Sequence, residues 1–157
     1  MKKALSVVLI FVAILSYVEA SAQTNYKTYS NTRFGYSISY PSDLIVPQGE
    51  ADNGDGQKFL AKDECAEMLV YGRLKLEAND TLKKIYNTAI ADLGDKATYK
   101  VLKSNWFVVS GKRNGKIYYQ KTMLKRDIFI TFSIEYDESK NATYDAVTTR
   151  IVKSFVG

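Results

Sequence analysis

The chain has 157 residues with 22 Lys and Arg, 17 Asp and Glu, one Cys and no His, for a formal net charge of +5. This length fits one domain, and a hydrophobic fraction of 46% is enough for a packed core. Without His, the chain has no Ser-His or Cys-His nucleophile pair, no His general base and no His-ligated metal. A single Cys excludes an internal disulfide and multi-cysteine metal clusters.

The N-terminal segment has the pattern of an export signal. Two lysines precede a nearly uninterrupted apolar run over residues 4–18, and Ala-Ser-Ala follows at residues 20–22, the small-x-small pattern that signal peptidase accepts. The run is shorter than the about 20 apolar residues that a spanning helix needs. We therefore predict a signal peptide over residues 1–22, cleaved after Ala22, and a periplasmic or secreted mature protein that does not span the membrane.

The first half of the mature chain predicts short strands. Aromatic residues and Ile alternate with small residues over residues 34–40, which predicts a half-buried strand that ends at Pro41. Residues 47–56 are rich in Gly, Asn and Asp and predict a loop. Apolar alternation then predicts strands over residues 57–60 and 68–76.

Two segments have the apolar spacing of amphipathic helices. The first has apolar side chains at i, i+3, i+4, i+7, i+8 and i+11 over residues 82–93, with Asn79 or Asp80 as the expected N-cap and Gly94 as the expected positive-φ residue after the helix. The second has Ser139 or Asn141 as its expected cap. Its predicted apolar face consists of Tyr144, Val147, Thr148, Ile151, Val152 and Phe155.

Between the helices the sequence predicts an antiparallel meander with strands at residues 98–103, 105–112, 116–125 and 128–136. Asn114-Gly115 is a strong hairpin signal, because both residues tolerate positive φ. Consecutive strands joined by tight turns are antiparallel. We therefore predict an α+β domain over residues 31–157, an antiparallel sheet layered with two amphipathic helices, preceded by a lead-in over residues 23–30.

The positive charge is concentrated in one window. Nine cations and no carboxylate lie between Lys96 and Arg126, while the rest of the mature chain is mildly acidic. One interpretation is a face that binds an anionic partner, with Trp106 as a partner anchor. The alternative is that these cations are solvated strand and turn residues, and that Trp106 belongs to the core. The candidate face consists of Lys112, Arg113, Lys116, Lys121, Lys125 and Arg126.

Other chemistries have weaker support. A carboxylate pair for glycan hydrolysis would have to come from distant positions, and the sequence singles out no pair. A loose calcium site could use Glu50, Asp52 and Asp55, although the loop does not fit the EF-hand register. Cys65 lies among acidic residues, which disfavour a reactive thiolate, so an inert thiol is expected; an intermolecular disulfide stays open.

The opening strand Phe-Gly-Tyr-Ser-Ile-Ser-Tyr-Pro at residues 34–41, the mid-chain helix, the long meander and the closing helix ending in Ser154-Phe155 resemble the PsbP-like superfamily. That superfamily is named for an extrinsic subunit of the photosynthetic oxygen-evolving complex and has exported bacterial relatives of unknown role. The resemblance covers about residues 31–157. It implies an α/β/α sandwich and non-enzymatic binding or assembly roles, and it transfers no functional residue.

The leading hypothesis is a non-enzymatic, exported binding or accessory protein of the cell envelope that needs no cofactor. Its expected partner is an envelope protein or an anionic envelope polymer, and nucleic acid is not expected for an exported chain. The competing hypothesis is a carboxylate-based hydrolase acting on envelope glycans.

Overall fold

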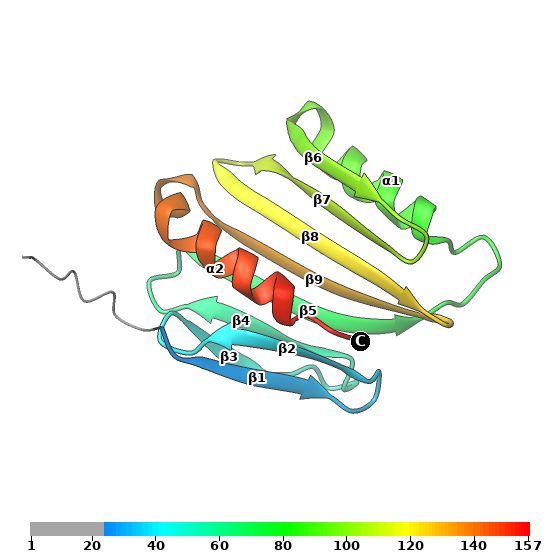
Figure 1. Ribbon diagram of the computed structural model, residues 1–157, viewed down its shortest axis with the longest axis horizontal. Coiled ribbons are helices and arrows are strands. Elements are labelled where there is room, and N and C mark those ends of the chain that lie inside the picture. Colours follow the sequence, from blue (N-terminus) through cyan, green and yellow to red (C-terminus); the bar gives the residue numbers. More distant parts are fainter. Residues whose placement is uncertain (1–23) are drawn as a thin grey trace, which may run out of the picture.

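The computed structural model describes residues 24–157, so the predicted signal peptide over residues 1–22 lies outside the described part of the chain. Within that part, neither α-helix is long and apolar enough to cross a membrane. The elements in chain order are β1 (Tyr26–Asn31), β2 (Tyr36–Pro41), β3 (Ile45–Glu50), β4 (Gly56–Ala61), β5 (Ala66–Leu74), α1 (Leu82–Leu93), β6 (Ala97–Leu102), β7 (Trp106–Arg113), β8 (Lys116–Lys125), β9 (Ile128–Asp137) and α2 (Asn141–Ser154) (Figure 1).

Seven strands form one sheet in the order β3-β4-β5-β9-β8-β7-β6, and every neighbouring pair is antiparallel. The strands β6 to β9 are the predicted meander, and β9 then pairs with β5 in the centre of the sheet. The strands β1 and β2 form a separate two-stranded hairpin. Figure 1 shows this hairpin and α2 on the same face of the sheet. The predicted α+β architecture is confirmed.

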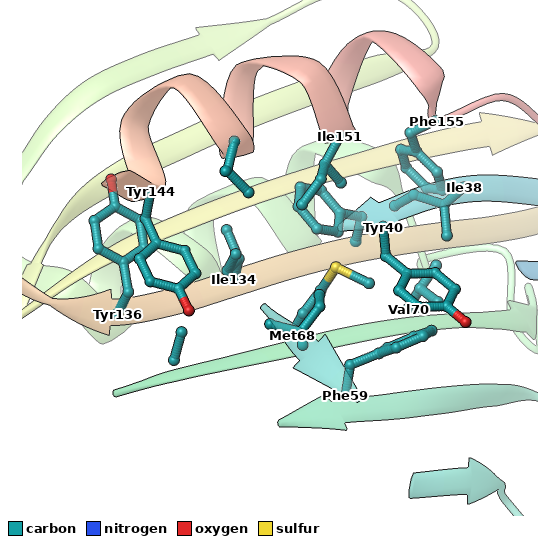
Figure 2. Packing of buried hydrophobic residues seen from close by; sticks show 14 of the residues in the cluster. Ile38, Tyr40, Phe59, Met68, Val70, Ile134, Tyr136, Tyr144, Ile151 and Phe155 are labelled. Atoms are coloured by element: carbon teal, nitrogen blue, oxygen red, sulfur yellow. The ribbon is translucent and has the colours of Figure 1, made fainter. Parts of the chain in front are cut away.

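Alternation along the central strand β9 supplies both faces of the sheet with core residues. Ile130, Phe132 and Ile134 are at most 1% exposed and pack in the cluster that contains the hairpin and α2. Figure 2 shows Ile134 and Tyr136 of β9 beneath Tyr144 and Ile151 of α2. Phe129 points to the opposite face and packs in the smaller cluster beneath α1. Successive side chains of a strand point to opposite faces, so one strand anchors both outer layers.

The α1 helix covers β7 through the apolar face that its spacing predicts. Leu82, Ala89 and Leu93 are buried against Phe107, Val109 and Phe129. Tyr86 adds an edge-to-face contact with Phe107, with ring centroids 5.5 Å apart. Gly94 follows the helix with a φ of 59°, as predicted, and its N–H donates to the carbonyls of Ile90 and Ala91.

The predicted helix caps are wrong in both helices. Thr81, rather than Asn79 or Asp80, caps α1, because its side-chain oxygen accepts from the Lys84 N–H at 3.1 Å. The Asp80 carboxylate is instead bound by the Arg73 guanidinium at 2.6 and 3.0 Å. The α2 helix has no side-chain cap, because a 3₁₀ turn over Glu138–Lys140 leads directly into it.

Two strands lie where no strand was predicted. The strand β1 falls largely within the expected lead-in, and β3 occupies part of the expected loop over residues 47–56. Half of the residues of β1 and five of the six residues of β3 are exposed, so their sequences have no buried alternation. In β3, Pro47 and the following register shift interrupt the pairing with β4, which is typical of an edge strand.

The packing of Phe34 over Gly72 yields a stability prediction. A Cβ built at Gly72 would lie 2.5 Å from Cγ of the buried Phe34 ring, closer than the ring can tolerate without moving. We expect Gly72→Ala to lower the free energy of unfolding by about 1–3 kcal/mol, measured by urea denaturation. The same change in a Phe34→Ala background should cost clearly less, because the clashing ring is gone. Equal costs in the two backgrounds would contradict this explanation.

Candidate functional site

The six cations of the predicted anionic-partner face do not form one face. Lys112, Arg113 and Lys116 flank the β7–β8 turn, whereas Lys125 and Arg126 lie at the β8–β9 turn. The ten residues of β8 separate the two turns by about 30 Å at ~3.4 Å per residue. The two groups therefore belong to opposite ends of the sheet.

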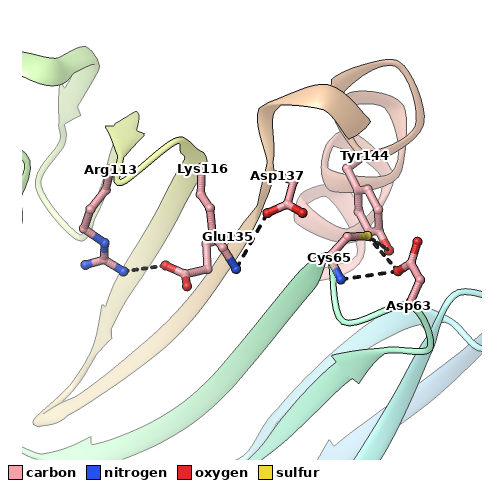
Figure 3. A network of polar contacts seen from close by, with 7 residues as sticks. All are labelled: Asp63, Cys65, Arg113, Lys116, Glu135, Asp137 and Tyr144. Atoms are coloured by element: carbon pink, nitrogen blue, oxygen red, sulfur yellow. Dashed lines mark hydrogen bonds and ion pairs between the residues drawn. The ribbon is translucent and has the colours of Figure 1, made fainter.

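Carboxylates from the end of β9 and the turn after it neutralise the β7–β8 end. Figure 3 shows Arg113 Nη2 bound to Glu135 Oε2 at 2.6 Å and Lys116 Nζ beside Asp137 Oδ1 at 3.9 Å. Lys112 makes a third ion pair, with Glu138. These acidic residues follow the basic window in sequence, and the β8–β9 pairing brings them alongside it.

The sixth candidate, Lys121, lies in the middle of β8 and points towards α2. Its Nζ is 5.7 Å from the centroid of the Phe155 ring, in a cation–π arrangement. Burial lowers the pKa of Lys121. Its charge is therefore partly desolvated against the core and less available to a partner than a charge on a turn.

The opposite end of the sheet keeps its positive charge. Lys125 and Arg126 are exposed there, and neither makes an ion pair with any residue between 24 and 157. Three further lysines from neighbouring elements also make no ion pair within residues 24–157; Lys83 and Lys103 are exposed and Lys75 is half-buried. We call this surface the basic end; it consists of Lys75, Lys83, Lys103, Lys125 and Arg126.

Backbone pairing brings the segments of the basic end together. The Lys75 N–H donates to the Asp127 carbonyl at 2.7 Å, and the Leu124 N–H donates to the Asn105 carbonyl at 2.8 Å. Lys75, Lys83 and Lys103 line one shallow hollow of about 280 Å³ at the start of α1. The Asp80 carboxylate also borders this hollow, but it is already paired with Arg73. Most of the local cations are thus left without a protein partner.

Trp106 begins β7 beside this end. Its carbonyl accepts from the Lys103 N–H at 2.8 Å, and its strand register places it opposite Met123. The side chain is half-buried on the sheet face that also carries Lys121. The structure thus places the predicted anchor near the basic end and away from the neutralised β7–β8 turn.

Sequence reasoning missed Lys75 and Lys83, because both lie outside the basic window. The signal that could have located them is their position at element boundaries. Lys75 directly follows β5, and Lys83 lies in the first turn of α1. In a sheet where β5 and β9 are antiparallel neighbours, the end of β5 meets the start of β9 and therefore the β8–β9 turn.

The hydrolase hypothesis requires two carboxylates that face each other. Glu67 of β5 and Glu135 of β9 are direct cross-strand neighbours and line a hollow of about 190 Å³. Each already makes an ion pair, Glu67 with Lys58 at 2.8 Å and Glu135 with Arg113. The hollow is smaller than the about 300–1,000 Å³ of typical ligand pockets. The arrangement is that of a cross-strand charge network on a sheet surface.

The acidic loop after β3 shows no ligand cluster. Glu50 Oε1 accepts from the Tyr29 hydroxyl at 2.7 Å, and Asp55 Oδ2 accepts from the Asn53 amide at 2.8 Å. Among residues 24–157, no three His, Cys, Asp or Glu side chains gather as metal ligands. Two of the three side chains that suggested a calcium site, Glu50 and Asp55, are instead occupied by hydrogen bonds within this region.

Cys65 is a buried thiol held by two neighbours (Figure 3). Its Sγ donates to Asp63 Oδ1 at 2.7 Å and lies 3.7 Å from the Tyr144 hydroxyl. Burial raises the pKa of the Cys65 thiol, and the Asp63 carboxylate adds to the rise. The hydrogen bond from Cys65, together with Lys140, lowers the pKa of Asp63 to about 2. The pair therefore favours a protonated thiol beside an ionised carboxylate.

Comparison with solved structures identifies the fold. The solution structure of cyanobacterial PsbP (CyanoP) from Synechocystis sp. PCC 6803 matches with a TM-score of 0.61 and 15% sequence identity, over 90% of this chain and 98% of that one. A crystal structure from Bacteroides thetaiotaomicron VPI-5482 matches with a TM-score of 0.53 and 13% identity, over 83% of this chain and 48% of that one. Neither protein-family models nor curated protein sequences match. The chain has a PsbP-like fold, which confirms the predicted resemblance.

The environment of Cys65 predicts a thiol that reacts slowly with thiol reagents. We expect Ellman's reagent to label the native protein at pH 8 at least about 100-fold more slowly than the urea-unfolded protein, because the thiolate is disfavoured and the sulfur is buried. The exposed Ser104→Cys variant provides the matched control, since one of its two thiols should react at the unfolded rate. Rapid labelling of native Cys65 would show that the site opens readily or that the thiol is activated.

Proposed function

We propose that the protein is exported to the periplasm or beyond the cell and acts there without catalysis, as a binding or accessory module of the cell envelope that contacts an anionic partner through its basic end. The observation that supports this contact is the set of cations at the basic end that lack ion pairs among residues 24–157. Export is inferred from the sequence pattern of residues 1–22.

Free cations on two turns and a helix start suit a polyanion better than a single small anion. The groups come from separate elements, and three of them line a shallow hollow rather than an enclosed pocket. An extended anionic surface can meet several such charges at once, and their attraction accelerates association at low salt. The neutralised β7–β8 end should contribute little, because it lies several Debye lengths away at physiological ionic strength.

The test compares two double variants with the same change in net charge. Lys103→Glu with Lys125→Glu reverses the basic end at two exposed positions, whereas Lys112→Glu with Lys116→Glu alters the neutralised end. We expect the first variant to bind immobilised heparin, a model polyanion, at least about tenfold more weakly in 0.1 M salt. The second should stay within about threefold of the wild type. Co-sedimentation with the native envelope fraction should follow the same order.

Melting temperatures of both variants provide the folding control. Equal weakening in the two variants would show that overall charge, rather than the basic end, governs binding, and would overturn the proposed contact. Undiminished binding of the first variant would overturn it as well.

A further inference from the structure

A second hollow of about 500 Å³ lies beside α2, on the sheet face opposite α1. One wall is α2, and the floor is formed by β8, β7 and the edge strand β6. We call it the α2 groove. Its lining residues are Tyr99, Ser110, Ile117, Tyr119, Tyr136, Asn141, Asp145, Thr148, Thr149, Val152 and Lys153.

The groove exists because the layer over this face of the sheet is incomplete. The α2 helix packs over β9 and β2 through Tyr144, Val147 and Ile151, and the β1–β2 hairpin covers the other half of the sheet (Figures 1 and 2). The second helix, α1, lies on the opposite face. No helix or strand of the described part of the chain therefore covers the outer strands β6 to β8 on the α2 side.

Among residues 24–157, a buried polar group at the groove has no hydrogen-bond partner. Thr148 is 6% exposed, and its Oγ1 makes no hydrogen bond. The neighbouring Tyr136 hydroxyl lies near Thr148 and influences it electrostatically, but it is directed at Asn141 Oδ1, 3.4 Å away, and no hydrogen bond of normal geometry joins it to Thr148 Oγ1. Buried hydroxyls almost always have a partner, because an unpaired one loses its hydration without compensation. The side chain of Thr148 borders the groove, so a bound molecule could supply the missing bond.

The other groups of the groove combine aromatic rings with uncharged hydrogen-bonding side chains. Tyr99 is 55% exposed at the edge of the groove, so its ring is accessible to a ligand. Tyr119 is sheltered beside it, and burial together with Tyr99 raises the pKa of Tyr119 to about 12. Asp145 and Lys153 are the charged members, and their formal charges cancel.

We propose that the α2 groove binds a neutral carbohydrate, with a sugar ring against the face of Tyr99 and sugar hydroxyls bonded to Thr148 and Asp145. The C–H face of a sugar ring is apolar enough to pack on an aromatic ring, while its hydroxyls both donate and accept hydrogen bonds. A groove lined by rings, hydroxyls, an amide and a carboxylate offers both kinds of contact.

The spacing of the charges argues against a free amino acid as the ligand. Asp145 and Lys153 are two turns apart on α2, about 12 Å along the helix axis. The ammonium and carboxylate of an amino acid are carried by one carbon atom and cannot reach both groups. A small anion is also disfavoured, because the carboxylate of Asp145 faces the groove together with the single cation.

This ligand site is separate from the basic end and does not depend on the proposed contact there. The experiment follows backbone amide shifts of the ¹⁵N-labelled protein during titration with cellobiose, maltose and N,N′-diacetylchitobiose, and with glutamate as a charged amino-acid probe. We expect saturable shifts at Asn141, Asp145 and Thr148 with at least one of the sugars and none with glutamate.

Two variants test the roles of the named side chains. Tyr99→Ala removes an exposed ring and should abolish the sugar-dependent shifts while leaving the melting temperature within a few degrees. Thr148→Val keeps the shape of the side chain but removes the unpaired hydroxyl, so the melting temperature should hold or rise while sugar affinity falls at least fivefold. Leu102→Ala is the control, because Leu102 is exposed on the same strand but faces the α1 side.

Each outcome of these experiments either supports or overturns the sugar-binding proposal. Sugar shifts that are lost in Tyr99→Ala and kept in Leu102→Ala would support the proposal. The proposal would be overturned by an absence of groove shifts with all three sugars, by shifts that Tyr99→Ala leaves unchanged, or by binding of glutamate alone. A change in melting temperature without a change in affinity for Thr148→Val would assign that residue a structural role only and overturn its part in the site. None of these results depends on heparin binding, so the two proposals can fail separately.

Discussion

The packing of α2 against β9 is the contact on which the surfaces of this protein depend. Ile151 and Phe132 are fully buried between the two elements, and Phe155 packs on Phe132 with ring centroids 5.8 Å apart. This contact fixes the helix over the centre of the sheet and beside the β1–β2 hairpin. One helix cannot cover all seven strands, because it is narrower than three strands of a sheet. The position of α2 thus determines which strands are covered and which line a groove.

The same central strand also governs the charge distribution. The strand β9 starts at the β8–β9 turn, in the basic end, and finishes beside Glu135 and Asp137, at the end where the β7–β8 cations are paired. The carboxylates at one end of a single strand therefore neutralise one end of the sheet and leave the other positive. The asymmetry is a property of the antiparallel register, not of the local sequence composition.

Much of the fold could be predicted because its central elements carry strong local patterns. Alternation over residues 128–136 and helical spacing over residues 82–93 both follow from burial of one face, and the structure reproduces both. The strands β1 and β3 escaped prediction because they lie at the periphery and bury few side chains. The α1 cap was missed because the Asp80 side chain is engaged by Arg73, a partner seven residues away that cap patterns do not consider.

The candidate sites were harder to predict for a different physical reason. A segment rich in Lys and Arg stays unpaired in the structure only if no neighbouring strand places carboxylates beside it. The register of the strands determines whether such carboxylates lie there. Glu135 is remote from Arg113 in sequence but lies within 2.6 Å of it in space. The α2 groove depends on where a helix crosses a sheet, and hydrophobic spacing predicts the buried face of a helix but not its position over the strands. Thr148 was predicted on the buried face of α2, but its lack of a partner could be seen only in three dimensions.

The link between Ser37 and Val156 has a consequence for the order of folding. The two residues exchange backbone hydrogen bonds of 2.9 and 3.1 Å, so the segment after α2 pairs with β2, the second strand of the N-terminal hairpin. Contacts between residues so distant in sequence carry a large loop-closure cost and form late. The hairpin also packs on Phe59, which is much closer to it in sequence, whereas its link to Val156 can form only after that residue is available. We therefore expect the bridge between Ser37 and Val156 to be among the last contacts of the domain to form.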